Sequence, residues 1–409
     1  MTLTPRPPAF VPEKFTGNFT QQEPIPEDGI AAALEVLRSG RLHRYNLLPG
    51  EEGQTATLER EFAAAMGVPY CLAVASGGYA LACALRALGV QHGDPVLTNA
   101  FTLAPVPGAI ASIGAVPVFV EVTESLTLDI DDMAAQARAT GAKVLMLSHM
   151  RGHLCDMDRL LAVCADLGVQ IIEDCAHTMG ARWNGRLSGT DGVIGCYSTQ
   201  TYKHMNSGEG GLIVSRDPAI MARATMLSGS YMLYGRHTAG PGPEAYDQIR
   251  YDTPNVSGRM DHLRAAILRP QLARLLTQCD RWNDRYRTVE AGITGTPGLT
   301  VVARPEQEYF VGSSIQFLLL DWAADRVTEV VRRCAARGVE LKWFGAAEPV
   351  AFTSKHDSWR YAPPRAMPRT DRILAGLLDM RLPLTFSIAD CEVIAAIIRA
   401  EVAAVYQAG

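Results

Sequence analysis

Short apolar runs alternate with amphipathic segments along the middle of the chain, from about residue 57 to residue 215. Seven runs are short and rich in β-branched residues, as strands are: 71–75, 96–98, 116–122, 144–148, 170–173, 193–197 and 212–214. Between several of them apolar residues recur at helical spacing, as at Leu81, Leu85 and Leu88 before Gly89. The pattern predicts a mostly parallel sheet with helices on both of its faces.

The pattern changes after residue 260. It predicts a long helix over 260–279 that continues through 281–287, then a strand at 313–320, a helix at 324–337, a strand at 339–343 and a helix at 389–406. We therefore predict an α/β fold in two parts. The N-terminal segment and a large domain take residues 1–280, and a smaller α+β domain takes residues 281–409. Residues 238–254 are rich in proline and glycine and predict a long functional loop.

Composition and charge narrow the class of protein. The chain has 38 Lys and Arg against 43 Asp and Glu, and it has no basic cluster, so we expect no nucleic-acid partner. It has no apolar run long enough for a transmembrane helix, and its first residues lack the apolar core of a signal peptide. The nine cysteines form no C-x-x-C pair, which favours reduced, buried thiols in a cytoplasmic protein over disulfides or a metal site.

Three groups of polar residues follow predicted strands, and ligands of parallel sheets bind beyond the carboxyl ends of strands. The first group is Ser76, Gly77 and Gly78, between a strand and a helix. The glycines let the backbone approach a ligand closely, and the helix N-terminus attracts an anion, so the group suits a phosphate. A simple tight turn has the same composition, and this motif alone does not decide between the two.

The second group contains Asp174 and, three residues later, His177. Asp174 ends a buried apolar strand, where a carboxylate is costly unless it meets a cation or several donors. A pyridinium N–H is such a partner, and a protonated pyridine ring is the electron sink that aldimine chemistry needs. A capping aspartate and an ordinary core histidine are the alternatives.

The third group runs from Ser198 to Lys203 and is followed by a glycine-rich turn at 206–211. A lysine at a strand end can become nucleophilic when burial or a nearby cation lowers its pKa. Ser198 is placed to bind the same phosphate as the first group. An exposed loop lysine is the alternative, but the placement of all three groups at strand ends of one sheet favours a common site.

These residues resemble a known family. The combination of SGG before an apolar helix, EDCAH-x-x-GA, S-x-x-x-x-K and SGEGG is similar to that of the DegT/StrS-type aminotransferases, which act on keto-sugars and cyclitols. The resemblance covers residues 27–406, and its EDCAH and S-x-x-x-x-K-x-x-x-SGEGG elements are specific.

The resemblance implies an aspartate-aminotransferase-like fold, a homodimer and pyridoxal 5'-phosphate as cofactor. By matching position, Lys203 forms the Schiff base and moves the proton between substrate and cofactor, Asp174 pairs with the pyridine nitrogen, and His177 contacts the ring oxygen. The implied reaction is a ping-pong transfer of an amino group from an amino acid, typically glutamate, to a small ketone. The residues implied in phosphate binding are Gly77, Gly78 and Ser198.

Two departures from the family pattern concern the cofactor pocket. Leu103 stands where the family has an aromatic residue stacked on the ring, with Phe101 two residues earlier. Ser257 stands where the family has an asparagine that reaches the phosphate from the neighbouring subunit, with Asn255 two residues further back. We expect Leu103 and Ser257 to take these two places, or the ring to be sandwiched differently.

Other departures concern the substrate. A cation, Arg151, replaces the usual aromatic residue of the family's HLYG-like turn, and His153, Arg236 and His237 add further basic groups. If these residues line the pocket, they suit a carboxylate or phosphate on the substrate. The alternative is that these four residues have structural or surface roles, which is the more common situation for arginine and histidine.

The leading interpretation is therefore an aminotransferase acting on a ketone of a sugar, cyclitol or related polar metabolite. Two alternatives stay open. The same cofactor residues serve dehydration, aldol-type cleavage or carbon–carbon bond formation equally well, because the cofactor carries the chemistry. A non-catalytic regulatory relative is the other, and the presence of Lys203 argues against it.

Overall fold

The computed structural model describes residues 14–408, so the expected lack of a signal peptide falls mainly on residues outside the described part. Its centre is a seven-stranded sheet in the order β1-β9-β8-β5-β4-β2-β3. The strands are β1 (Tyr70–Val74), β2 (Pro95–Asn99), β3 (Val116–Val120), β4 (Val144–Ser148), β5 (Gln170–Asp174), β8 (Ile194–Ser198) and β9 (Gly211–Ser215). All neighbours pair in parallel except β9, which is antiparallel to both β8 and β1. The predicted mostly parallel sheet is confirmed.

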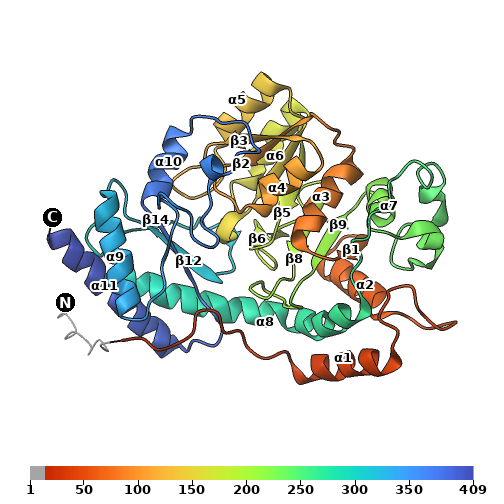
Figure 1. Cartoon of the computed structure of the whole chain (residues 1–409), viewed down its shortest axis with the longest axis horizontal. Helices are drawn as coiled ribbons and strands as arrows, with labels where there is room; N and C mark the ends of the chain where they lie inside the picture. Colours follow the sequence, from red (N-terminus) through yellow and green to blue (C-terminus); the bar gives the residue numbers. More distant parts are fainter. Residues whose placement is uncertain (1–13, 409) are drawn as a thin grey trace.

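Helices cover both faces of this sheet (Figure 1). One face packs against α2 (Gln54–Met66), α5 (Ile130–Thr140), α6 (Met157–Leu167) and α8 (His262–Ile293), and the other against α3 (Gly77–Leu88), α4 (Pro105–Ser112) and α7 (Pro218–Leu227). In β4 the side chains alternate, with Leu145 and Leu147 on the first face and Val144 and Met146 on the second. Burial on both faces explains why the strands are continuous apolar runs.

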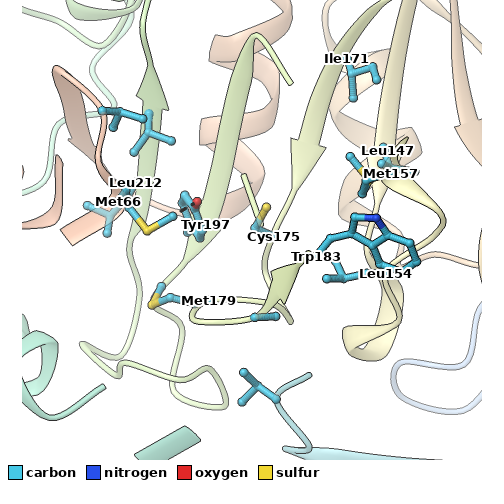
Figure 2. Close-up of a cluster of buried hydrophobic side chains, with 14 of the residues drawn as sticks. Met66, Leu147, Leu154, Met157, Ile171, Cys175, Met179, Trp183, Tyr197 and Leu212 are labelled. Atoms are coloured by element: carbon cyan, nitrogen blue, oxygen red, sulfur yellow. Dashed lines mark hydrogen bonds between the residues drawn. The ribbon is translucent and has the colours of Figure 1, made fainter. Parts of the chain in front are cut away.

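Figure 2 shows part of the core on the first face, where Tyr197 from β8 lies close to Met66 from α2. The hydroxyl of Tyr197 is buried and donates a hydrogen bond of 2.7 Å to the Ser188 carbonyl. A buried hydroxyl without such a partner would cost about 1–3 kcal/mol, so this bond is what lets a tyrosine occupy the core. The packing holds β8 and the chain that leads to Lys203 in place.

A second sheet has the order β10-β12-β14-β13 and is antiparallel throughout. Its strands are β10 (Thr300–Val301), β12 (Ser314–Leu318), β13 (Lys342–Trp343) and β14 (Leu377–Arg381), and α9 (Ala324–Ala336), α10 (Pro368–Ala375) and α11 (Ile388–Gln407) pack near it. Figure 1 shows α8 running from the large sheet to α11, and α8 also contacts α1 (Glu27–Ser39). The helix α8 continues through residue 280, where the sequence predicted a division into two domains. That division stays a prediction.

Four parts of the structure differ from the expected elements. The strand predicted over 339–343 is shorter, because the backbone N–H of Val339 bonds to the Cys334 carbonyl and closes the end of α9. Neither β14 nor α10 was predicted. The segment 238–254 is mostly irregular, as expected, but it contains a short 3₁₀ turn, η3 (Pro243–Tyr246). Another 3₁₀ turn, η2 (Tyr231–Arg236), precedes the segment. A third small sheet joins β11 (Glu308–Tyr309), β6 (Arg182–Trp183) and β7 (Arg186–Leu187).

The cysteines agree with the sequence-based expectation. All nine are buried, and they form no disulfide in the part of the chain that the structure describes. Among helices of residues 14–408, none combines the length and the apolar character needed to cross a bilayer.

Candidate active site

A cavity of about 370 Å³ opens at the carboxyl ends of β4, β5 and β8, beside the N-terminus of α3. The structure brings almost all of the predicted site residues together around it. Of the eight, seven line this cavity: Gly77, Gly78, Leu103, Asp174, His177, Ser198 and Lys203. Ser257 is the exception; it is exposed, and its hydroxyl lies 3.5 Å from that of Tyr231.

The two glycine-rich motifs meet on the floor of the cavity. A Cβ atom at Gly77 would lie 2.8 Å from the Cβ of Ser198, so the turn and the end of β8 approach too closely for any other residue. The pairing of β9 produces this approach, because Gly211 lies opposite both Val74 and Ser198. Ser76 caps α3 by accepting a hydrogen bond of 3.1 Å from Tyr79, and the first N–H groups of the helix point at the cavity end. This floor is suited to an anion.

Asp174 lies at the end of β5 and is only 8% exposed. Burial raises the pKa of its carboxyl, while the N–H of Ala176, the charge of Lys203 and the hydroxyl of Ser148 oppose that shift without cancelling it. Its hydrogen bonds are few: Ala176 donates from the backbone at 3.1 Å and Ser148 from its side chain at 3.2 Å. Among residues 14–408, no cation forms a direct ion pair with this carboxylate, as one normally does with a buried negative charge.

Ser148, which orients Asp174, was not predicted from the sequence. It ends β4 directly opposite Asp174 in the sheet register, and it accepts a hydrogen bond of 2.8 Å from Thr102. Its backbone is held by Asn99, whose side chain bonds both its N–H and its carbonyl. In the sequence, the position of Ser148 at the end of the strand that neighbours β5 could have indicated its role.

Lys203 and His177 face each other across the cavity, with 2.9 Å between Nζ and Nε2. Burial lowers the pKa of Lys203 to about 7, and the positive charge of Arg151 adds to the effect. Burial also lowers the pKa of His177 well below its ordinary value, so this imidazole is neutral and its Nε2 can accept a hydrogen bond from the lysine. In a large fraction of the molecules, the Lys203 side chain is therefore an uncharged amine at neutral pH, as a nucleophile must be.

Much of the remaining wall of the cavity is apolar, although Gln200, Glu209 and Ser354 also line it. Leu103 lines it, whereas Phe101 is buried against Phe344, with 5.2 Å between the ring centroids, and does not reach it. Phe352 also lines it and is half exposed. Leu103 therefore lies at the cavity and Phe101 does not; whether Leu103 packs on the ring or the ring is sandwiched differently stays a prediction.

The four basic residues considered from the sequence have different surroundings. Arg151 is buried and borders Lys203, but Arg236 is exposed and lies away from the cavity of its own chain. His153 bonds Gln316 at 2.8 Å, outside the cavity. His237 is buried between Tyr45 and the ion pair of Arg44 with Glu59. Only Arg151 of the four is near the predicted chemistry.

Comparison with known proteins identifies the family. A model of the DegT/DnrJ/EryC1/StrS aminotransferase family matches residues 25–399. The chain belongs to this family. It is 29% identical over 360 residues to a putative L-glutamine:3-amino-2,3-dideoxy-scyllo-inosose aminotransferase of Streptoalloteichus tenebrarius, and the match covers 84% of this chain and 83% of that protein. It is 36% identical over 270 residues to a 3-amino-5-hydroxybenzoate synthase of Amycolatopsis mediterranei, which covers 65% of this chain and 64% of that protein.

Solved structures agree with the family. A 3-amino-5-hydroxybenzoic acid synthase superposes with a TM-score of 0.80 at 27% identity, over 94% of this chain and 98% of that one. The Streptomyces venezuelae protein DesV, solved with a ketimine intermediate, has a TM-score of 0.76 at 27% identity, over 91% and 93%. The predicted fold class, that of the pyridoxal-phosphate-dependent transferases, is confirmed. This member of the DegT family is an aminotransferase, and its family implies pyridoxal phosphate as cofactor.

Proposed function

We propose that this aminotransferase uses pyridoxal 5'-phosphate, held at Lys203, to move an amino group from an amino acid to a ketone on the ring of a sugar, a cyclitol or a related polar metabolite. The observation that carries the proposal is the convergence of Asp174, His177, Lys203 and the Gly77–Ser198 floor on one cavity. The acceptor class follows the named activities of relatives, among them a dTDP-3-amino-3,4,6-trideoxy-alpha-D-glucose transaminase of Streptomyces venezuelae, 34% identical over 275 residues.

The residues around the cavity fit this cofactor. Gly77, Gly78 and Ser198, with the N-terminus of α3, would hold the phosphate, and Leu103 would pack on the ring. Asp174 would meet the ring nitrogen, which supplies the cation that the buried carboxylate lacks. When bound, pyridoxal phosphate supplies an aldehyde that condenses with amines and a pyridinium ring that withdraws electrons from the reacting carbon.

The protein itself supplies a base and its orientation. Lys203 has a pKa of about 7, so it can take a proton from the substrate carbon and return one at neutral pH. His177 holds the Nζ atom of Lys203 at 2.9 Å and thereby limits where that proton can go. Ser148, bonded to Asp174, keeps the carboxylate facing the cavity.

The proposal has three further parts: the oligomeric state, the amino donor and the location. We propose a homodimer, in which Ser257, exposed in one subunit, reaches the phosphate site of the other. The amino donor is glutamine or glutamate, because relatives are named for L-glutamine as donor. A cytoplasmic location is proposed from the nine buried, unpaired cysteines.

The test is spectroscopic. Protein purified with excess pyridoxal phosphate and desalted should be yellow, and glutamine or glutamate should remove the yellow band in the first half-reaction. A ketone acceptor should then restore it. A yellow protein that no amino donor bleaches would favour dehydration, aldol-type or carbon–carbon chemistry over transamination, and a colourless protein would contradict the proposal altogether.

The site of attachment needs its own control, because Lys342 also has a lowered pKa, about 8, caused mainly by burial. Borohydride reduction and peptide mapping should mark Lys203 rather than Lys342. Lys203→Ala should lose the yellow band, while Lys143→Ala, which changes an exposed lysine bonded to the Leu167 carbonyl, should keep it.

A further inference from the structure

A second, smaller cavity of about 60 Å³ adjoins the first and shares Lys203 and His177 with it. Its other walls include Arg151, Tyr202 and Arg381. The cavity lies on the side of Lys203 away from the anion-binding floor, because none of the floor residues lines it. Whatever group occupies it is therefore next to the reacting amine, on the substrate side of the site.

Three cations from separate elements lie near Lys203, and two of them, Arg151 and Arg381, line this cavity. Arg151 lies in the 3₁₀ turn η1 (Met150–Gly152) after β4, Lys342 lies in β13, and Arg381 ends β14. Each of them shifts the pKa of Lys203 downwards, which shows that all three lie within electrostatic reach of it. The turn that carries Arg151 is strained, because this residue has φ 54°, in the left-handed region that costs a non-glycine residue about 1 kcal/mol or more. The fold thus holds an arginine here at some cost.

The nearby negative charge does not satisfy these cations. Asp379 is fully buried and lies 3.0 Å from a terminal nitrogen of Arg151 and 4.0 Å from Nζ of Lys342. Neither contact has hydrogen-bond geometry, so Nε and one terminal nitrogen of Arg151 and the Nζ of Lys342 are buried without a hydrogen-bond partner among residues 14–408. The other oxygen of Asp379 accepts from Gln316 at 2.7 Å. Buried donors of this kind cost free energy until an acceptor meets them.

Arg381 is partly exposed, unlike Arg151. Its guanidinium lies 3.7 Å from the centroid of the Tyr202 ring, which holds it beside the cavity without neutralising its charge. Glu340, the other acid that acts on Lys342, is exposed to solvent. Three cations therefore share one buried carboxylate, and the cluster, defined as Arg151, Lys342, Arg381 and Asp379, has unused positive charge.

We infer that this cluster binds a carboxylate on the acceptor, so that the ketone which receives the amino group is an acid and not a neutral sugar. The inference rests on the proposed function and adds to it the chemical class of the acceptor. A planar carboxylate matches the fork of an arginine, and two arginines next to each other bind it better than a lysine alone does.

One site serves two substrates in turn in a ping-pong transfer. The amino acid donor brings a carboxylate one bond from its reacting carbon, and the cluster is where that carboxylate can be paired. When the acceptor then binds in the same place, a neutral ketone would cover the same cations and leave them desolvated and unpaired. An acceptor with its own carboxylate avoids that loss, and a neutral one is selected against.

The first test measures binding without turnover. Calorimetry on the cofactor-loaded protein should show 3-hydroxybenzoate binding at least about tenfold more tightly than 3-hydroxybenzamide, the preference that one charge-assisted hydrogen bond supplies. Arg381→Gln should remove most of this preference. Arg372→Gln, which changes an exposed arginine paired with Glu124 and Asp321, should leave it unchanged. Equal binding of the two ligands by the unmodified protein overturns the inference, and so does tighter binding of phenyl phosphate than of 3-hydroxybenzoate.

The second test measures the acceptor half-reaction. Protein bleached with glutamine should recover its yellow band at least about tenfold faster with 3-oxocyclohexanecarboxylate than with the matching amide, compared at equal subsaturating concentration, and Arg381→Gln should abolish the difference. Recovery at equal rates shows that the cluster serves the donor alone and overturns the inference. If the donor never bleaches the protein, the proposed function fails, while the calorimetric result still decides whether the cluster binds a carboxylate.

Arg151 needs a paired change, because removing it alone leaves Asp379 buried without a cation. The double variant Arg151→Gln with Asp379→Asn removes both charges of the ion pair. It should keep the yellow band and lose the preference for 3-hydroxybenzoate. Retention of the full preference in both this variant and Arg381→Gln contradicts the assignment of the cluster.

Discussion

Glu173 and Asp174 are consecutive carboxylates at the end of β5, but they point to opposite sides of the sheet into very different surroundings. Glu173 accepts four hydrogen bonds: from His149 at 3.0 Å and from the backbone N–H groups of Gly189, Asp191 and Gly192 at 2.8, 3.0 and 2.6 Å. Within the described residues, Asp174 accepts only two, from Ala176 and Ser148. Both are buried, so the number of donors is what separates them.

The pKa values of the two groups shift in opposite directions. Burial alone would raise the pKa of Glu173, but the hydrogen bonds and charge around it, first of all those of His149, hold it below the ordinary value. For Asp174 the effect of burial dominates and the pKa is raised. A buried carboxylate with all its donors present is a structural element, whereas one with donors missing is suited to a ligand that brings a positive charge.

The same comparison explains a group that resembles a metal site. His149, Glu173 and Cys175 have ligand atoms within 4.8 Å of one another. Both oxygens of Glu173 are already engaged by N–H groups, and burial raises the pKa of Cys175 well above its ordinary value, which keeps the thiol protonated. These residues therefore lock the loop 188–192 to β5 instead of offering free ligands.

The largest expected effect is on catalysis at Asp174. Asp174→Asn keeps the shape but cannot hold the pyridine nitrogen protonated, so kcat should fall about a thousandfold, while the phosphate floor still retains the cofactor. Stopped-flow measurement of the donor half-reaction gives the rate, and the yellow band gives the occupancy. Turnover close to that of the unmodified protein, with full occupancy, would show that the role assigned to Asp174 is wrong.

Glu173→Gln should affect stability instead. An amide places an NH₂ group against backbone N–H donors, so this change should lower the free energy of unfolding by about 3 kcal/mol. Asp174→Asn is the matched control, because in the cofactor-free protein it removes an unpaired buried charge and should leave stability unchanged or higher. Urea unfolding of the two cofactor-free variants measures the contrast. Equal stability losses for both would remove the distinction between the two carboxylates.

The pH dependence of stability should show the same contrast with opposite signs. The lowered pKa of Glu173 means that its stabilisation is present above the unfolded-state pKa and is lost as the pH falls through the folded-state pKa. The raised pKa of Asp174 means that its contribution is most favourable at low pH and is lost as the pH rises through its folded-state pKa.

Over the range from about pH 3 to about pH 7, and relative to the unmodified cofactor-free protein, Asp174→Asn should therefore gain stability as the pH rises above about 4. Glu173→Gln should lose stability as the pH rises towards about 4.5 and should change little above it. A tenfold difference in acid dissociation constant between the folded and unfolded states contributes at most about 1.4 kcal/mol to the free energy of unfolding. Unfolding midpoints measured across this range decide the matter. Parallel curves for the two variants would mean that both carboxylates have the same environment.

The sequence predicted Asp174 and Lys203 but not what distinguishes Asp174 from its neighbour. Strand ends of a parallel sheet meet at one edge, and apolar runs locate those ends, so residues at positions 174, 177, 198 and 203 could be expected together. The donors around Glu173 come from a turn at 189–192 whose shape no local pattern specifies. The number of donors is a property of the folded loop.

The cationic cluster was even harder to predict from the sequence than the donors around Glu173. Arg151 was noticed because it departs from the family pattern, but Lys342, Asp379 and Arg381 were not, and the strand that carries Arg381 was missed. A buried aspartate interrupts the apolar run of β14, which hides the strand from a search for apolar periodicity. Arg151 and Asp379 are far apart along the chain, and only the packing of the second sheet against η1 brings them together.

The smallest expected effect concerns Ser148, the donor that Asp174 has and Glu173 lacks. Ser148→Ala removes the 3.2 Å hydrogen bond to Asp174 and leaves Thr102 without its acceptor, but the backbone of residue 148 stays bonded to Asn99. With one donor fewer, the carboxylate should be harder to ionise, and kcat should fall about tenfold, as expected for a positioning residue. The acidic limb of the kcat profile should move to higher pH, because loss of a donor raises the pKa of Asp174 further. Ser148→Thr, which keeps the hydroxyl, should restore both; a tenfold loss with an unmoved acidic limb would mean that Ser148 acts through packing and not through Asp174.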